Sequence, residues 1–599
     1  MRARIVLLLF FFVWISLLSR VFYLSVHSNR YYEKLSNENT IHTELIAPVR
    51  GEILDRNGRP MAINKLGFRI EIAAHMSTKK KRAALDRTID TIAKWLPMLD
   101  AKRMKTTYLR HDSHYNHHPI AVVDFVSYED ILPVYSRLNL LENVKVTPAP
   151  KRYYPYQKVA AHIIGYTAKA NQKEIDRDEV LKLTGIVGKS GLEKRYNTFL
   201  QGIPGEKTVQ MNALNEEMSV LRTKPPVENR TLTLNVDIRL QQYITALMEG
   251  RAGAVIVMGV DGSILSAGSY PEYNPNTFVS GISQAKWKAL IDDLDMPFTD
   301  KIVNGLYPPG STIKPSVGLI YLSNGIGRWW NVTCTGSMKL GNRRFRCWKS
   351  WGHGKTDINK AIRESCDDYF YKGSLKVGIA AISAGLKRYG FGKKTGIDLP
   401  NEFIGTVPNR AWKRKRYDEP WYIGETLNTS IGQGSVLVTP IQIAQNTALI
   451  ASGLRPVPRL ARRLENNDTR PVLEDVLTPE EKKMLPVIRH AMRQVCNHPA
   501  GTATKHIDSK IVIAGKTGTA QVIGISQATR KRIKEEDMAY YTRSHAWLTT
   551  YGPAADPQYV VTVLIEHGGH GGSAAGQIVS RIYDKLLELG YIDEKRRKR

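Results

Sequence analysis

The longest run of hydrophobic residues in this chain lies at its N-terminus. Residues 5–26 are almost all apolar and follow a short basic head at residues 1–4. A run of this length spans a lipid bilayer as a helix, so it predicts a transmembrane signal anchor. A cleaved signal peptide is the alternative, but Ser25-Val26-His27 is a poor cleavage site. The positive charge of the head predicts that it stays in the cytoplasm and that the rest of the chain is exported.

Residues 27–228 form a second region, in which short strand-like segments alternate with charged helical ones. The region ends at Pro225-Pro226, because prolines followed by polar residues interrupt regular structure. No cluster of charged residues in this region indicates catalysis. We therefore expect an elongated, mixed α/β pedestal that binds partners.

Residues 229–592 carry the clearest buried strand and helix patterns. Ala254–Met258 and Ile264–Ala267 predict a β-hairpin, and helical segments follow from about residue 309 to 389. Three more strand-like segments come late in the region: Lys510–Val522, Trp547–Tyr551 and Tyr559–Ile565. This order predicts an antiparallel five-stranded sheet flanked by helices, so the predicted fold class is α+β. We expect residues 593–599 to form a basic tail.

The composition narrows the possible classes of function. Of 599 residues, 86 are Lys or Arg and 56 are Asp or Glu, which gives a formal net charge of +30. Such an excess suits an anionic partner, for example a membrane surface or a wall polymer. Zinc-finger spacing, RNP patterns and basic heptads are absent from the sequence, so we expect no nucleic-acid partner. Four cysteines are too few for a disulfide scaffold in so long a chain.

Candidate chemistry begins in the stretch 307–315, which reads Tyr-Pro-Pro-Gly-Ser-Thr-Ile-Lys-Pro. Ser311 and Lys314 are three residues apart, so they share one face if this segment is helical. A serine hydroxyl becomes a nucleophile when a base takes its proton, and a lysine in a dry pocket can stay neutral enough to do so. Two other S-x-x-K matches, at residues 77–80 and 283–286, lie in polar surface sequence.

Two later motifs single out Ser311 from the other matches. Ser365-Cys366-Asp367 lies 54 residues after Ser311, and Lys516-Thr517-Gly518-Thr519 follows the β-branched run Ile511-Val512-Ile513. The β-branched run predicts a strand beneath the second motif. A further K-T-G match at residues 394–396 lies in a glycine-rich loop, and we interpret it as accidental.

The order S-x-x-K, S-x-D and K-T-G resembles that of the penicillin-binding protein transpeptidases. Further segments resemble the same family: Arg50-Gly51, Asp55-Arg56-Asn57-Gly58, Gly191-Leu192-Glu193 and Ser430-Ile431-Gly432-Gln433-Gly434. The resemblance covers nearly all of the chain after the anchor. The region before Pro226 lacks a glycosyltransferase motif, which points to class B of the family. Trp348, Trp351 and His353 resemble positions in its elongation-type members.

This resemblance implies a serine-type peptidoglycan D,D-transpeptidase that cross-links stem peptides during cell-wall elongation and rod-shape maintenance. It implies that β-lactams are inhibitors and that catalysis needs no cofactor. In the family's mechanism Ser311 would be the nucleophile and Lys314 its base. Ser365 would relay a proton to the leaving amine, with help from Lys516.

The resemblance also implies how the donor peptide is held. Lys516, Thr517 and Thr519 would bind its terminal carboxylate, and Gly518 would let it approach the strand closely. Asp367 stands where the family usually has Asn. A carboxylate accepts hydrogen bonds but cannot donate them as an amide does, so we expect Asp367 to hold Lys314 electrostatically.

Membership of this family would place the protein in the cell inner membrane, with one span and a periplasmic catalytic domain. Implied partners are a glycosyltransferase of the shape, elongation, division and sporulation family and an MreC-type elongation protein. A D,D-carboxypeptidase or a β-lactamase would share the three motifs, but the uncleaved anchor and the large front region argue against both. A non-catalytic wall-binding or β-lactam-binding scaffold is the alternative outside enzymes, and the complete set of catalytic residue types argues against it.

Three of the four cysteines, Cys334, Cys347 and Cys366, fall within 33 residues together with His353. Three thiols and an imidazole form a full tetrahedral ligand set for structural zinc. A Cys334–Cys347 disulfide is the rival interpretation in an oxidising compartment, and unrelated thiols are a third. Because Cys366 lies between Ser365 and Asp367, a metal here would brace the predicted active site. We interpret Cys496 as a buried thiol.

Overall fold

The computed structural model describes residues 2–27, 41–116, 118–211, 217–228, 230–522 and 535–593. All but one residue of the predicted basic tail, and the first twelve residues of the charged segment 523–544, lie outside these ranges. The chain divides into two compact units. The first comprises Met1–Gly51, Ala170–Ile186 and Gln201–Arg230, and the second comprises Glu52–Lys169, Val187–Leu200 and Thr231–Arg599.

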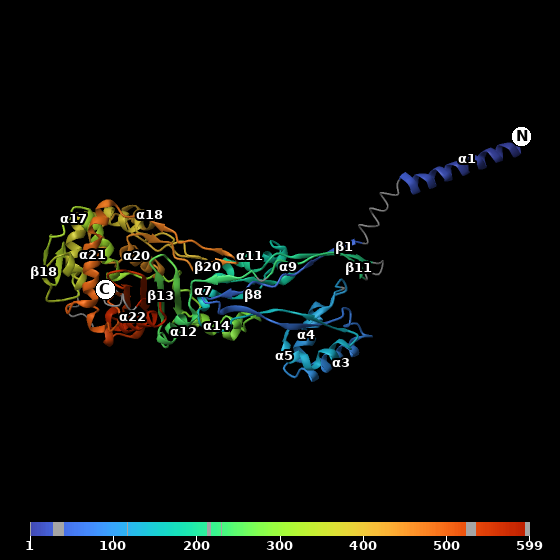
Figure 1. Cartoon of the computed structure of the whole chain (residues 1–599), viewed down its shortest axis with the longest axis horizontal. Coiled ribbons are helices and arrows are strands. Elements are labelled where there is room, and N and C mark those ends of the chain that lie inside the picture. The colour runs from blue at the N-terminus through green and yellow to red at the C-terminus, as the bar shows by residue number, and fades with distance from the viewer. Residues whose placement is uncertain are drawn as a thin grey trace. The chain divides into compact units, whose positions relative to one another are not determined.

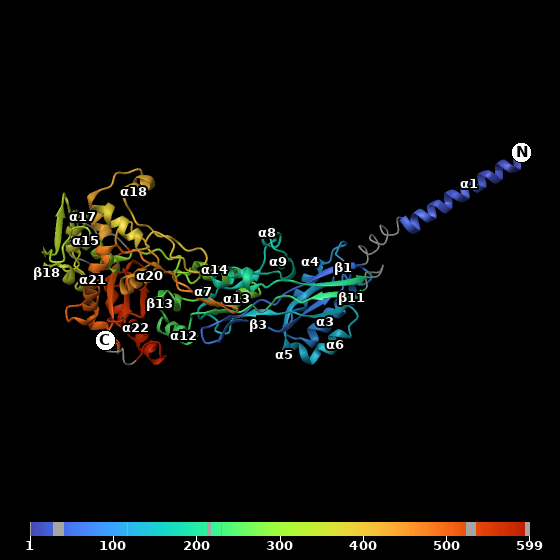
Figure 2. The same ribbon diagram turned by 45° about the horizontal axis from the view of Figure 1, so that its top comes forward.

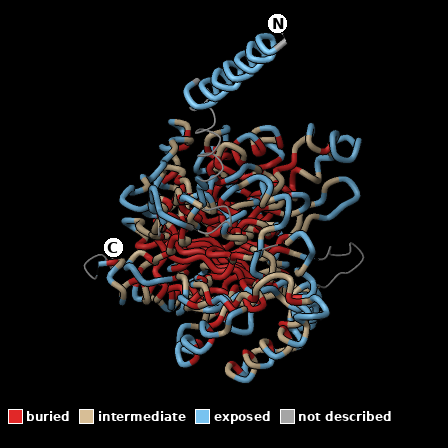
Figure 3. The backbone as a smooth tube through the Cα atoms, turned by 90° about the vertical axis from the view of Figure 1, so that its right-hand side faces the viewer, coloured by how far each residue is buried: buried red, intermediate tan, exposed pale blue. Residues whose placement is uncertain are grey.

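The first unit begins with the predicted membrane helix. Helix α1 (Arg2–Phe22) continues into the helical turn η1 (Tyr23–His27). Residues Ala3–Val26 are long and apolar enough to cross a membrane, and none of this segment is buried by protein. In Figure 3 the helix is exposed along its length. An apolar helix with no protein around it fits the predicted single-pass anchor.

The rest of the first unit is a small antiparallel sheet with two short helices. Its strand order is β1-β10-β11, with bounds Ile41–Ile46, Gly205–Met211 and Glu217–Lys224. The helices are α8 (Gln172–Ile175) and α9 (Glu179–Thr184), and each is capped at its N-terminus by a side chain, from Asn171 and Asp178 respectively.

The second unit contains a three-stranded sheet with its own hydrophobic core. The strands are β4 (Gly67–Ile72), β5 (Ile120–Ser127) and β6 (Val144–Pro148), in the order β5-β4-β6. The amphipathic helices α3 (Arg82–Trp95) and α4 (Ala101–His111) bury Leu85, Ile89 and Tyr108 in this core.

A six-stranded sheet in the second unit joins four distant parts of the chain. Its order is β21-β20-β12-β2-β3-β7. The bounds are Asn467–Asp468, Ala461–Leu464, Leu232–Leu234, Ile53–Leu54, Pro60–Lys65 and Lys151–Tyr153. The early strand β2 therefore pairs with β12, which pairs in turn with the late strand β20.

The predicted antiparallel five-stranded sheet is confirmed, with the order β14-β13-β25-β24-β23. Its strands are Ile264–Tyr270, Gly253–Gly259, Tyr559–Ile565, His545–Gly552 and Ala514–Ala520. Strand β13 pairs with β25 over seven residues although some 300 residues separate them in sequence. Nearly every residue of the five strands is buried, because helices cover both faces.

Adjacent threonines on β24 show which helices cover the two faces. Thr549 shares a hydrogen bond of 2.7 Å with Thr447 on α20 (Pro440–Ser452), and Thr550 one of 3.2 Å with Tyr583 on α22 (Gly571–Glu588). Successive strand residues point to opposite faces, so α20 and α22 cover opposite faces. Both views show β13 between these helices (Figures 1 and 2).

A helical layer beside the sheet positions the predicted catalytic residues. Helix α15 (Lys314–Ser323) has every residue but the last buried and packs against α17 (Asp367–Arg388) and α21 (Pro479–Asn497). Helix α16 (Ile358–Arg363) contacts α15, and α19 (Ile423–Ser430) packs against α17. Other helices of this unit are α12 (Ile238–Leu247), α14 (Gln284–Asp292) and α18 (Arg410–Tyr417).

Candidate active site

Ser311 lies in a 3-10 turn, Gly310–Ile313, that leads directly into α15. The helix can begin here because Pro315 stands in its first turn, where no amide hydrogen is needed. Gly310 has φ +52° and packs so closely that a Cβ atom would lie 2.7 Å from the Thr519 carbonyl oxygen. Glycine at this position therefore lets the serine loop lie against strand β23.

Lys314, the first residue of α15, is completely buried. Its Nζ donates to Asp367 Oδ1 at 2.7 Å and to the Ser365 carbonyl at 2.9 Å, and it lies 3.4 Å from Ser365 Oγ. Burial raises the pKa of Asp367, and the charge of Lys314 opposes that rise. The expected electrostatic contact between Asp367 and Lys314 is therefore present.

Lys516 approaches the same serine from strand β23. Its Nζ donates to Ser365 Oγ at 3.0 Å and to the Thr517 carbonyl at 3.0 Å. Burial holds the pKa of Lys516 well below its ordinary value, and the nearby charge of Lys314 lowers it further. Ser365 itself has φ +57°, a conformation that non-glycine residues rarely adopt. Its hydroxyl thus lies between two lysine nitrogens.

Strand β23 carries the three predicted substrate-binding residues next to the serine loop. A Cβ atom on Gly518 would lie 2.8 Å from Thr312 Cγ2, so only glycine fits between strand and loop. Thr517 Oγ1 shares a hydrogen bond of 2.7 Å with Thr502, and the Thr519 carbonyl accepts one of 3.2 Å from Gln433. The predicted strand context of this motif is confirmed.

Four of the five predicted catalytic residues form one hydrogen-bonded chain: Lys314, Ser365, Asp367 and Lys516. Ser311 lies beside this chain but is not joined to it. Within the described part of the protein, no hydrogen bond involves Ser311 Oγ, and the residue is only partly buried. The hydroxyl is therefore not held by another group within these ranges.

Sequence reasoning missed a buried ion pair behind the serine loop. Lys301 Nζ donates to Glu566 Oε2 at 2.7 Å, and the Tyr307 hydroxyl donates to Glu566 Oε1 at 2.6 Å. Trp547 Nε1 donates to the Pro308 carbonyl at 3.2 Å. These contacts fix the residues just before Ser311. The sequence offered one signal for this pair, because Glu566 is a charged residue directly after the apolar strand 559–565.

The cysteine and histidine ligand atoms converge as predicted. One ligand atom from each of Cys334, Cys347, His353 and Cys366 lies within 4.8 Å of every other, and all four residues are buried. His353 Nδ1 is 3.6 Å from Cys334 Sγ and 3.5 Å from Cys347 Sγ. All four cysteines are free, so the Cys334–Cys347 disulfide is not formed.

The thiols of this cluster share their protons unequally. Hydrogen bonds from Cys366, and secondarily from His353, lower the pKa values of Cys334 and Cys347 to about 4 despite their burial. The same hydrogen bonds raise the pKa of Cys366. A cluster that favours two thiolates in a buried place suits a bound cation.

The cluster is tied to the predicted catalytic residues by backbone contacts. The Asp367 amide donates to Cys347 Sγ at 3.4 Å, and the Trp348 amide donates to Asp367 Oδ2 at 3.0 Å. Trp348 Nε1 also donates to the Glu364 carbonyl at 2.9 Å. The Trp348 amide therefore positions Oδ2 of Asp367, while Lys314 binds Oδ1.

Comparison with known families gives two matches along the chain. Residues 252–584 match the penicillin-binding protein transpeptidase domain, and residues 45–234 match the penicillin-binding protein dimerisation domain. The peptidoglycan D,D-transpeptidase MrdA of Haemophilus influenzae is 33% identical over 95% of this chain and 89% of its own length.

Solved structures are similar over almost the whole chain. A complex between penicillin-binding protein PBP2 and MreC from Helicobacter pylori includes a chain with 42% identity and a TM-score of 0.84. That match covers 92% of this chain and 99% of the other. A peptidoglycan synthase complex that coordinates polymerisation and crosslinking includes a chain with 25% identity and a TM-score of 0.71. In that case 99% of each chain is covered.

Proposed function

The chain belongs to the class B penicillin-binding proteins of the PBP2 type, and from this premise we propose that it is a peptidoglycan D,D-transpeptidase working through an acyl-enzyme on Ser311. The observation that carries the proposal is the position of Ser365 Oγ. It lies 3.0 Å from Lys516 Nζ and 3.4 Å from Lys314 Nζ, beside an open serine. Such a chain of groups can take up a proton and pass it on.

In the first half of the reaction, Ser311 Oγ attacks the penultimate D-Ala carbonyl of a donor stem peptide. Lys314, acting as the neutral amine, accepts the hydroxyl proton, and Asp367 stabilises the ammonium that forms. The backbone amides of Ser311 and Thr519 stabilise the tetrahedral oxyanion. The proton then passes through Ser365 to the leaving D-Ala amine, the C–N bond breaks, and an ester remains on Ser311.

In the second half, the amine of a neighbouring stem peptide attacks this ester. The attacking amine loses a proton to the same relay, and Ser311 Oγ is released as a hydroxyl when the new peptide bond forms. The product is a cross-link, and no net proton is gained or lost over the cycle.

Recognition of the donor fits the electrostatics of β23. Lys516 is buried beside another lysine, which depresses its pKa. An incoming terminal carboxylate supplies the negative partner that favours the charged form of Lys516, and the hydroxyls of Thr517 and Thr519 add donors. Binding of the correct substrate therefore charges the residue that holds it.

Covalent labelling with fluorescent penicillin tests the nucleophile. Wild type should label and Ser311→Ala should not, while Ser283→Ala, in the S-x-x-K match at the start of α14, should label normally. Label retained on Ser311→Ala would falsify the assignment.

Product analysis with a donor pentapeptide and an acceptor amine separates the rival activities. Cross-linked product supports the transpeptidase, whereas release of D-Ala alone supports a D,D-carboxypeptidase.

We also propose that Cys334, Cys347, His353 and Cys366 hold a structural zinc ion. Zn–S bonds of about 2.3 Å and Zn–N bonds of about 2.0–2.1 Å give tetrahedron edges of about 3.6 Å. The His353–cysteine distances of 3.5 and 3.6 Å support this geometry. Elemental analysis should find about one zinc per chain and none in Cys347→Ser, with Cys496→Ser as the control. Wild-type protein without zinc, purified free of chelator, would overturn the proposal.

For location and partners, we propose an inner-membrane protein with a cytoplasmic N-terminus and a periplasmic catalytic domain. It would work with an MreC-type protein and a membrane glycosyltransferase of the shape, elongation, division and sporulation family. The similarity to the Helicobacter pylori PBP2 in its complex with MreC supports the first partner, and the synthase complex supports the second. A C-terminal alkaline phosphatase fusion should be active, and co-purification with each partner should survive Ser311→Ala.

A further inference from the structure

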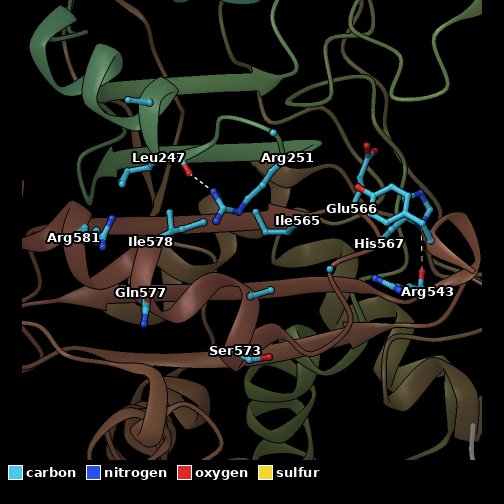
Figure 4. Close-up of a pocket in the computed structure, with 15 residues that line it drawn as sticks. Leu247, Arg251, Arg543, Ile565, Glu566, His567, Ser573, Gln577, Ile578 and Arg581 are labelled. Carbon is cyan, nitrogen blue, oxygen red and sulfur yellow. Dashed lines mark hydrogen bonds between the residues drawn. The ribbon is translucent and has the colours of Figure 1, made fainter. Parts of the chain in front are cut away.

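A pocket of about 490 Å³ lies on the α22 side of the five-stranded sheet, outside the residues assigned to catalysis. It is bounded by the end of α12, the segment 540–543, the end of β25 and the first turns of α22 (Figure 4). None of the predicted catalytic or substrate-binding residues lines it. The pocket is therefore a separate space on the transpeptidase domain.

Three arginines from three separate elements line this pocket. Arg251 follows α12, Arg543 precedes β24, and Arg581 lies on α22. Glu566 is the one carboxylate among the lining residues, and Lys301 and Tyr307 already engage its two oxygens at 2.7 and 2.6 Å. Both oxygens of Glu566 are therefore already engaged, and Glu566 forms no ion pair with the three arginines.

The arginines keep donors available for a ligand. Arg581 makes no hydrogen bond or ion pair with any residue in the described ranges. Arg251 uses Nη1 on the Leu247 carbonyl at 2.6 Å, as Figure 4 shows. Arg543 uses Nε on the Met538 carbonyl at 3.1 Å and Nη2 on the Glu536 carbonyl at 3.4 Å. Each guanidinium has five N–H donors, so most remain unused.

From this arrangement we propose that the pocket binds a ligand bearing oxyanion groups, either carboxylates or phosphates. Arginine forks recognise both groups through paired hydrogen bonds. Gln577 and Ser573 on α22 add polar groups beside the arginines. A cavity of this size admits a ligand with two or three such groups, and wall peptides and lipid-linked precursors are possible sources of the two chemistries.

Within the described ranges, no ion pair joins Arg251, Arg543 or Arg581 to an acidic side chain. One acidic side chain outside the lining, Glu535, accepts from the Ser544 amide and hydroxyl, both at 2.8 Å. It is therefore engaged at the turn and does not neutralise the arginines. Two exposed arginines elsewhere do pair with acidic side chains: Arg463 with Asp468 at 2.6 Å, and Arg414 with Asp418 at 3.7 Å.

Isothermal titration of the full-length protein in detergent tests this proposal. Citrate is the carboxylate probe and pyrophosphate the phosphate probe, each titrated at constant ionic strength in potassium chloride. We expect saturable binding of at least one probe to wild type. Binding should weaken at least tenfold in the double variant Arg251→Gln/Arg581→Gln and should be unchanged in Arg414→Gln.

The relative affinities of the two probes identify the chemistry of the natural ligand, and preference for either supports the proposal. No saturable binding to wild type overturns it, and so does equal binding to the double variant. Penicillin labelling of Ser311 checks that each variant is folded. The single variant Arg581→Gln, which breaks no contact within the described ranges, repeats the test should the double variant lose its fold.

Discussion

Two buried lysines, Lys301 and Lys314, flank Ser311 in the sequence and look alike at first sight. Each donates to a carboxylate at 2.7 Å, Lys301 to Glu566 and Lys314 to Asp367. The difference lies in their other partners. Lys301 donates to two backbone carbonyls, those of residues 270 and 295, which cannot give or take a proton. Lys314 shares the Ser365 hydroxyl with Lys516, and a hydroxyl can do both.

This comparison distinguishes a lysine that supports the fold, Lys301, from one that can take part in proton transfer, Lys314. The Lys301 pair is saturated, so it can only hold Tyr307 and the loop that follows. The Lys314 pair retains a group through which a proton can move. The same lysine–carboxylate pair can therefore support the fold or take part in proton transfer. The lysine's other partner, a carbonyl or a hydroxyl, decides between these roles.

Replacing Lys314 should have the largest effect. Lys314→Met removes the proposed base, so acylation by fluorescent penicillin should slow by roughly 10³- to 10⁴-fold. Stopped-flow labelling measures the rate, and thermal melting confirms that the variant is folded. An acylation rate within tenfold of wild type would show that Lys314 is a supporting residue like Lys301.

Replacing Lys301 should act on stability instead. Lys301→Met leaves Glu566 buried without its cation, so the free energy of unfolding should fall by about 3–4 kcal/mol. The double change Lys301→Met/Glu566→Gln should recover part of that loss. Denaturant unfolding of the two variants measures both values. If Lys301→Met instead slowed acylation a thousandfold at unchanged stability, the proposed division between the two lysines would be wrong.

A third carboxylate, the half-buried Glu272, forms no ion pair with a lysine within the described ranges. It accepts from the Ala160 amide at 2.8 Å and the Thr245 hydroxyl at 3.0 Å, and burial raises its pKa to about 8. The folded protein keeps the proton that the unfolded chain releases near pH 4.5, so this stabilisation is present at low pH and is lost as pH rises through about 8.

The isosteric variant Glu272→Gln should remove that pH dependence. Between pH 6 and 8 the stability of wild type relative to the variant should fall by about 2 kcal/mol. Denaturant melts at several pH values measure the difference. Parallel curves for the two proteins would show that Glu272 is ionised in the folded state.

The smallest expected effect is that of Asp367→Asn. Asparagine can keep one acceptor, but its amide cannot satisfy both Lys314 and the Trp348 amide as two carboxylate oxygens do. We expect acylation to slow by about tenfold at near-normal stability. Acylation kinetics beside a zinc assay distinguish loss of charge from damage to the adjacent cysteines. Unchanged kinetics would mean that the Asp367 charge has no part in holding Lys314.

Local sequence predicted much of this molecule. The apolar run, the five strands and the three motifs were readable because strand alternation and short spacings are local properties. The convergence of Cys334, Cys347, Cys366 and His353 was also predictable, since they crowd into one short window.

The sequence did not predict which distant segments pair with one another. The contact of Lys301 with Glu566 spans 265 residues, and a single sequence contains no signal that links such distant positions. The same holds for β2 beside β12 and β20. The sequence could not predict main-chain contacts either. The amide of Trp348 binds Asp367, and every residue except proline has such an amide, so residue type gives no signal.

The pairing of β13 with β25 also governs when the enzyme can first act. Strand β25 ends at residue 565, and β24 and β23 assemble against it. During synthesis β13 is made some 300 residues before β25, so the strand that carries Lys516 lacks its sheet until nearly the whole chain has been made. An unfinished chain therefore cannot form the hydrogen-bonded chain of Lys314, Ser365 and Lys516. We expect penicillin labelling only in copies whose last strands have been made.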